Sequence, residues 1–302
     1  MTVVSPATEA DWSTRFLPFR RGWFETEHGR LHYVDHGPTD APALVCLHGN
    51  PTWSFYYRHL IRALSNRYRV IALDHLGCGL SDKPDSFSYR LTDHVHNFGR
   101  LVQELGLSRY VLAVHDWGGA IGFGRAVEFP DELAGICVFN TAAFRSKRIP
   151  MSIALCRLPV VGSLGIQGMN GFLRVALLRC VSKPSRLTSE VVAGYLAPYD
   201  SWGARKAHLR FVQDIPLSPR HPSYSTLQGI EEGLSELRDH PMVIMWGGRD
   251  FCFDDSFYEE WRKRFPSAHA HHLDDCGHFV LEDGHEFIVP RLERFLDQEA
   301  NW

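Results

Sequence analysis

The sequence predicts an α/β fold with a mostly parallel, doubly wound sheet and an inserted helical segment. Short, continuous apolar runs recur along the chain, and segments with helical spacing separate them. The runs lie at 43–49, 69–77, 110–116, 135–141 and 241–250. Continuous apolar runs are typical of strands that are buried on both faces, as in a parallel sheet. Their alternation with helices indicates double winding.

The remaining elements follow from local periodicity. Alternating polarity around a His-Gly pair predicts a hairpin, and apolar residues three and four apart predict helices. In chain order we expect the hairpin at 23–37, helices at 55–67, 121–129 and 253–265, and a last strand at 268–278.

Residues 142–236 interrupt this alternation with mostly helical segments that glycine and proline break up. The simplest organisation is an α/β core made of residues 1–141 and 237–302, with residues 142–236 as a helical cap domain. Ligands of open α/β sheets bind at the carboxyl ends of the strands. We therefore expect one pocket between the cap and those strand ends.

Composition excludes several functional classes. The 302 residues carry a net charge of −3 with no basic block, so we expect no nucleic-acid partner. Seven scattered cysteines without a CxxC pair, and no signal-peptide pattern in residues 1–21, favour a cytoplasmic location. The longest uncharged run, 158–173, is shorter than the roughly 20 residues of a spanning helix. It leaves loose contact with a membrane or partner open, and a homo-oligomer is also left open.

The stretch LAVHDWGGAIG, residues 112–122, places Asp116 between a predicted strand and a predicted helix. A sharp strand-to-helix turn presents a nucleophile at the top of a sheet, and Gly118 and Gly119 are small enough for close packing. Val114 stands where the G-x-S-x-G pattern has glycine, so the match is partial. The alternative is an aspartate that caps the following helix.

Two further residues complete a candidate triad. His278 lies in a Cys-Gly-His turn after the last predicted strand, and Asp250 ends the strand before it. Along the chain the order is nucleophile, acid, base, which is the order of catalytic triads on α/β sheets with this kind of nucleophile turn. Asp254 and Asp255 compete for the acid role, although they suit a helix start better. The HAHHL run that begins at His269 is interpreted as a partly solvated strand face, so no metal site is expected.

Asn50 follows an early strand in the motif LHGNPTWS. Its backbone N–H and that of Trp117 are placed to stabilise an oxyanion. Taken alone, the Gly-Asn-Pro sequence is equally a turn without function.

These motifs together resemble the haloalkane dehalogenases of the α/β-hydrolase superfamily. The matching segments are HGNPTWSFYYR (48–58), DHLGCGLSDKP (74–84), VHDWGGAIG (114–122), WGGRDFCFD (246–254) and GHFVLED (277–283). Asn140 stands where many dehalogenases have a carboxylate, so placing the acid at Asp250 resembles the third subfamily. The cap stretch 195–217 is also similar to the β-lactone decarboxylases of bacterial long-chain olefin biosynthesis.

The resemblance implies an α/β-hydrolase fold and a small hydrophobic substrate. In the dehalogenase mechanism, Asp116 attacks the carbon that bears the halogen and forms an alkyl ester. His278, oriented by Asp250, then activates water, and the side chains of Asn50 and Trp117 hold the halide. A serine would form an ether, which water does not hydrolyse. No metal or organic cofactor is implied.

The alternatives use the same site. In the decarboxylase mechanism, Asp116 opens a β-lactone ring and loss of CO₂ leaves an alkene. An epoxide hydrolase would use Tyr195 and Tyr199 to protonate the ring oxygen, but Asn50 argues against it. A non-catalytic ligand-binding protein and a carboxylesterase, which needs serine at position 116, rank lower. The sequence ranks the dehalogenase first and the decarboxylase second.

Overall fold

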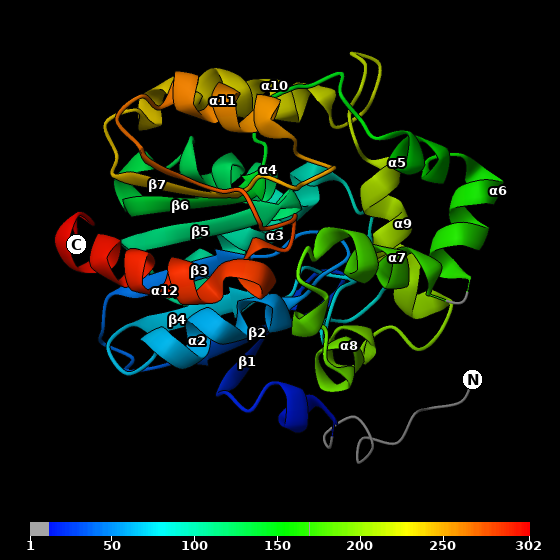
Figure 1. The fold of residues 1–302 in the computed structure, drawn as a ribbon, viewed down its shortest axis with the longest axis horizontal. Coiled ribbons are helices and arrows are strands. Elements are labelled where there is room, and N and C mark those ends of the chain that lie inside the picture. Colours follow the sequence, from blue (N-terminus) through cyan, green and yellow to red (C-terminus); the bar gives the residue numbers. More distant parts are fainter. Residues whose placement is uncertain (1–11, 169) are drawn as a thin grey trace.

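A computed structural model describes residues 12–168 and 170–302. Its central sheet has eight strands in the order β1-β2-β4-β3-β5-β6-β7-β8 (Figure 1). The strands are β1 (Arg21–Thr26), β2 (Gly29–His36), β3 (Ala43–Leu47), β4 (Arg69–Leu73), β5 (Tyr110–Asp116), β6 (Leu133–Thr141), β7 (Met242–Gly247) and β8 (His269–Leu273). β1 and β2 form the expected antiparallel hairpin, and all pairs from β4 to β8 are parallel. The predicted doubly wound α/β fold is confirmed.

Helices cover both faces of the sheet. The two layers consist of α3 (Leu91–Glu104), α4 (Trp117–Ala126) and α11 (Asp255–Arg264) on one face, and η1 (Ser54–Tyr57), α2 (Arg58–Leu64) and α12 (Val280–Gln298) on the other. Every residue of β5 is buried, with Leu112 and Val114 in one core cluster and Val111 and Ala113 in the other. This two-sided burial explains the continuous apolar runs, because neither face of the central strands meets water.

The chain between β6 and β7 is mostly helical and lies at one end of the molecule (Figure 1). It contains α5 (Met151–Cys156), α6 (Pro159–Gly162), the π-helical turn η3 (Ser163–Gln167), α7 (Gly171–Cys180), α8 (Ser189–Leu196), α9 (Lys206–Gln213) and α10 (Tyr224–Gly233). Of these, α10 packs against α3 and α4, and its Leu227 and Ile230 belong to the sheet core. The predicted cap range thus includes a helix that joins the core layer.

Two features of the structure concern the expected absence of a membrane span and the interpretation of the HAHHL run. No helix among the described residues is long and apolar enough to span a membrane. In the edge strand β8, His269 and His272 are exposed, in agreement with the partly solvated strand expected for HAHHL, and His272 hydrogen-bonds Asp255 and Asp274.

Candidate active site

Asp116 is the last residue of β5 and directly precedes α4. Its φ of 50° and ψ of −125° lie outside the regions that non-glycine residues favour. Such a backbone conformation costs about 1–3 kcal/mol and is found mainly at functional sites. A side chain at Gly119 would overlap the hydroxyl of Thr141, and one at Gly118 would overlap the carbonyl of Leu47. The Asp116 carboxylate makes no capping hydrogen bond to α4. The geometry therefore agrees with a nucleophile turn and argues against the helix-cap alternative.

The three predicted triad residues lie together at the carboxyl end of the sheet. Nδ1 of His278 is 2.6 Å from Oδ2 of Asp250, and its Nε2 is 3.6 Å from Oδ2 of Asp116. All three residues are buried, since they retain 2%, 6% and 9% exposure for His278, Asp250 and Asp116. The arrangement places one imidazole between two carboxylates.

Asp250 is held by more groups than the sequence indicated. Its Oδ2 accepts a hydrogen bond of 3.0 Å from the Asn140 side-chain amide, and its Oδ1 accepts from the backbone N–H groups of Cys252 and Phe253. The same Asn140 amide also exchanges two hydrogen bonds with the backbone of Gly247. Asn140 thus ties the ends of β6 and β7 together and positions the acid, a role that sequence reasoning missed.

The competing aspartates are engaged elsewhere. Asp254 accepts a 3.0 Å hydrogen bond from the backbone N–H of Ser256 at the start of α11 and forms an ion pair with Arg148. Asp255 lies 2.9 Å from the ring of His272. Neither contacts His278, so the structure favours Asp250 for the acid position.

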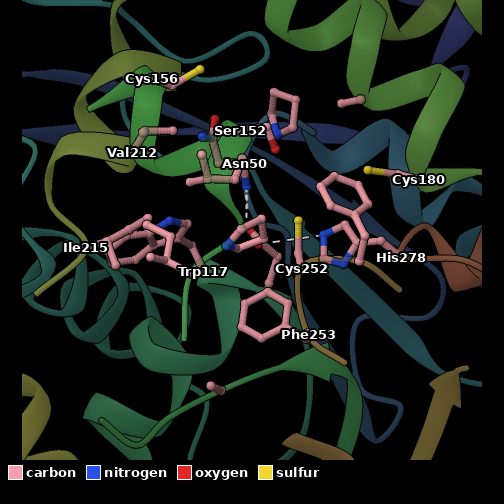
Figure 2. A pocket seen from close by; sticks show the side chains of 18 of the residues that line it. Asn50, Trp117, Ser152, Cys156, Cys180, Val212, Ile215, Cys252, Phe253 and His278 are labelled. Atoms are coloured by element: carbon pink, nitrogen blue, oxygen red, sulfur yellow. Dashed lines mark hydrogen bonds and ion pairs between the residues drawn. The ribbon is translucent and has the colours of Figure 1, made fainter. Parts of the chain in front are cut away.

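Asn50 and Trp117 border the Asp116 carboxylate. The backbone N–H of Asn50 donates a 2.6 Å hydrogen bond to Oδ1 of Asp116. The Asn50 amide Nδ2 donates to the carbonyl of His208 in α9, while its Oδ1 is buried without a partner among the described residues. The Trp117 ring packs on Phe211, with ring centroids 5.3 Å apart. Figure 2 shows the Asn50, Trp117 and His278 side chains around one pocket.

His115 is a second residue that the sequence did not single out. Its ring is fully buried, stacks on Tyr56, and lies 4.5 Å from the His278 ring between centroids. Its Nε2 is 2.9 Å from the carbonyl oxygen of His278. His115 therefore fixes the backbone that carries the candidate base. Its only sequence signal is its place directly before Asp116.

Burial and charge set the ionisation of the site. Burial raises the pKa of Asp116 above its usual value, although His278 and the N–H groups of Trp117 and Asn50 oppose that shift. Burial alone would lower the pKa of His278, but Asp250 and Asp116 more than reverse it, so the pKa is raised. The two carboxylates therefore favour the charged form of the His278 ring, while burial disfavours the ionised form of Asp116.

A cavity of about 370 Å³ covers these groups. Its polar end holds Asn50, Asp116, Trp117 and His278. Apolar side chains from the insertion line most of the rest, among them Ile153, Phe172, Val175, Ala176, Val212 and Leu227. The cavity is therefore suited to an apolar molecule with one polar, reactive end.

Tyr195 and Tyr199 do not line this cavity. The Tyr195 hydroxyl donates to the buried carboxylate of Glu282, and the Tyr199 hydroxyl donates to the carbonyl of Thr52 and accepts from the N–H of Gly79. Because both hydroxyls form hydrogen bonds away from the cavity, neither is available to protonate an epoxide oxygen in this structure.

Comparisons with known proteins give a matching family and several similar chains. A model of the "Alpha/beta hydrolase family" matches residues 44–290. A "Cis-3-alkyl-4-alkyloxetan-2-one decarboxylase" of Xanthomonas campestris pv. campestris is 42% identical, covering 89% of this chain and 92% of that protein. "Haloalkane dehalogenase 2" of Mycobacterium bovis is 35% identical, covering 93% and 96%. The solved haloalkane dehalogenase DatA of Agrobacterium tumefaciens C58 superposes with a TM-score of 0.83 at 26% identity, covering 95% of this chain and 99% of that one.

Proposed function

We propose, from the premise that this chain belongs to the alpha/beta hydrolase family, that it is a β-lactone decarboxylase. Its substrate would be an oxetan-2-one with alkyl groups at C3 and C4, and its products an alkene and CO₂. The observation that carries the proposal is the 42% identity to a decarboxylase of that substrate class over about nine-tenths of both chains. This reverses the ranking from the sequence, since the dehalogenase relative is less similar, at 35%.

In the first step, an Asp116 oxygen attacks C4 of the lactone ring. The C4–O bond breaks and its electron pair goes to the ring oxygen, so the former lactone carbonyl becomes a carboxylate. We assign the Asn50 amide and the Trp117 indole N–H as donors to that new anion, because both are neutral and line the pocket next to Asp116. Oδ1 of Asp116 is held by the Asn50 N–H at 2.6 Å, which leaves Oδ2 for the attack.

In the second step, the bond between C3 and the carboxylate breaks. Its electron pair forms the C3–C4 double bond, while the C4–O bond to Asp116 breaks and returns its pair to Asp116. The reaction consumes no water, and Asp116 is regenerated directly. A protonated His278, 3.6 Å from Asp116, would stabilise the departing carboxylate. Asp250 would keep the imidazolium oriented through its 2.6 Å contact with Nδ1.

Haloalkane hydrolysis is the second candidate, favoured by the dehalogenase relative and by the same four side chains. There, Asp116 would displace a halide held by Asn50 and Trp117. A neutral His278 would then deprotonate the water that hydrolyses the ester. The two reactions differ in what His278 must do, because it is a cation in one and a base in the other.

A side-by-side assay of the purified protein tests the proposal. We expect alkene and CO₂ in equal amounts from a cis-3,4-dialkyl β-lactone, and slower bromide release from a panel of alkyl bromides. Turnover of the lactone in H₂¹⁸O should leave Asp116 unlabelled, since no water enters the cycle. Bromide release without alkene formation would overturn the proposal and favour hydrolysis.

A further inference from the structure

An apolar surface, here called the cap face, is formed by α5, α6, η3 and the outer side of α7. These elements contact one another and lie at the end of the molecule away from the C-terminus (Figure 1). Of the eleven large apolar side chains that are exposed in the described part of the chain, eight lie between residues 151 and 178. They include Met151, Leu155, Val160, Leu164, Val175 and Leu178, which are 49–77% exposed. Soluble monomers rarely gather exposed apolar side chains in this way without a binding role.

The longer stretch from residue 142 to residue 189, which contains these elements, is strongly cationic. Residues 142–189 contain eight lysines and arginines and no aspartate or glutamate, in a chain whose net charge is −3. Some of these cations pair with acids outside the segment, as Arg148 does with Asp254. Lys147, Arg174 and Arg179 are exposed and form no ion pair within the described residues.

The exposed side of α7 carries both cationic and apolar residues. Arg174, Val175, Leu178 and Arg179 are all exposed, and their spacing of one, three and four residues places them along one stripe. An apolar stripe flanked by arginine is the pattern of a helix that lies in the interface of an anionic bilayer.

The cavity opens on this face. Ser152 of α5, Gly165 of η3 and Val175 of α7 line the cavity and are also exposed to solvent. The other end of the same cavity reaches Asp116. A molecule that enters between these three elements would therefore pass directly from the cap face to the reactive carboxylate.

We propose that the cap face docks on an anionic lipid bilayer, with the cavity mouth turned towards the acyl chains. Each lysine or arginine near an anionic surface adds to binding, and the exposed apolar side chains would enter the interface. A symmetric contact between two copies would set Arg174 and Arg179 of each copy against a like-charged surface, which disfavours that occupant. The surface does not depend on which reaction Asp116 performs, and it gives an apolar substrate a route from the bilayer.

Cosedimentation of the full chain with vesicles tests the proposal. We expect binding to vesicles of phosphatidylcholine with 30% phosphatidylglycerol, weaker binding to phosphatidylcholine alone, and release from the anionic vesicles at high salt. The variant Arg174→Gln should bind the anionic vesicles about fivefold more weakly, from about 1 kcal/mol per cation. Lys263→Gln removes one exposed cation of α11, outside the cap face, and should bind like the parent protein.

The apolar contribution has its own variant. Val160→Gln/Leu164→Gln/Leu178→Gln changes exposed side chains that do not line the cavity, and should lose most of the remaining binding. Circular dichroism and turnover of a short-chain, water-soluble substrate check that each variant is folded. Vesicle binding is measured without turnover, so its failure and a failure of the proposed reaction are separate results.

Three outcomes would overturn the proposal. The first is a parent protein that stays in the supernatant with anionic vesicles at low salt. The second is an equal loss of binding in the matched control Lys263→Gln. The third is an apolar triple variant that dissociates an oligomer, measured by analytical ultracentrifugation, while vesicle binding is unchanged, which would assign the cap face to self-association.

Discussion

At the scale of single residues, Asp116 combines an unusual backbone with an unusual environment. Its φ of 50° and its burial are both unfavourable for an aspartate that serves only packing. The Asn50 N–H and His278 compensate for this by stabilising the ionised side chain. Asp116 therefore lowers the stability of the fold. This agrees with a role as nucleophile, because active-site residues often reduce stability in favour of activity.

Replacement of Asp116 by alanine tests its role. We expect turnover of the accepted substrate to fall by about 10⁴-fold or more, because the bond-forming atom is lost. The free energy of unfolding should stay the same or rise, since a buried carboxylate is removed. Asp254→Ala, at the start of α11 and outside the cavity, is the matched control and should retain activity. Undiminished turnover in Asp116→Ala would refute the mechanism.

The raised pKa of His278 separates the two candidate reactions by pH. Hydrolysis needs the neutral imidazole, so halide release should decline as pH falls through a pKa above the usual 6.5. Decarboxylation as proposed needs an ionised Asp116 and a protonated His278, so alkene formation should persist as pH falls through that range and decline as pH rises above it. It should also decline when pH falls through the pKa of Asp116, which lies above the ordinary 3.8. Initial rates between pH 4 and pH 9 check this. An acid limb above pH 6.5 in alkene formation would exclude the cationic role of His278.

At the scale of elements, a buried ion pair joins η1 and α2 to the start of α12. The Arg58 guanidinium donates two hydrogen bonds to the Glu282 carboxylate, which also accepts from the Tyr195 hydroxyl. Burial would raise the pKa of Glu282, but Arg58 and the neighbouring donors lower it to about 2. Because α12 follows the His278 turn directly, this pair stabilises the segment that carries the candidate base.

Glu282→Gln should lower the free energy of unfolding by about 3–5 kcal/mol at pH 7, because Arg58 is left as a buried, unpaired charge. The pKa of Glu282 is depressed in the folded state, so its stabilisation is complete above the unfolded pKa of about 4.3. It is lost as pH falls towards 2, and the difference between parent and variant should shrink there. Urea denaturation across this pH range measures it. Glu259→Gln, which breaks an exposed pair with Arg262, should change stability by less than about 0.5 kcal/mol. Equal effects of the two substitutions would contradict this account.

At the scale of the whole molecule, the cavity lining comes partly from the core and mostly from the insertion. The strand ends provide the reactive groups, and α5, η3 and α7 provide an apolar wall with an opening. Substrate chain length should therefore depend on the insertion, while the chemical step depends on the core.

Val175→Trp tests this division because Val175 lines the cavity at its mouth. We expect kcat/KM for a long-chain substrate to fall by about tenfold or more, since overlap with a few methylene groups costs at least about 1.4 kcal/mol. A short-chain analogue should keep its kcat. Leu178→Trp, also exposed on α7 but outside the cavity lining, is the control and should leave both values unchanged. An equal loss for long and short chains would place Val175 in the chemical step instead.

Local patterns in the sequence predicted most of the sheet, because strands buried on both faces require continuous apolar runs whatever surrounds them. Two core helices were not predicted. In α3, the buried His94 and Asn97 interrupt the apolar stripe, and in α12, a kink at Gly284 and the internal Pro290 break the helical pattern. Helix α4 begins at Trp117, earlier than predicted, because a Trp-Gly-Gly start has no helix signal of its own.

Most strands in their chain order, and Asp116, His278, Asn50 and Trp117 as candidate site residues, could be predicted from the sequence, since each candidate lies at or just after a strand pattern. The folded structure was needed to show which carboxylate contacts His278, that Asn140 holds that carboxylate, and that Tyr195 and Tyr199 do not line the cavity. It also decided that the cationic apolar face surrounds the cavity mouth. The residues in these contacts lie far apart in the chain, as Asn140 and Asp250 do at 110 positions. Such contacts depend on how packed elements meet in space and not on local periodicity.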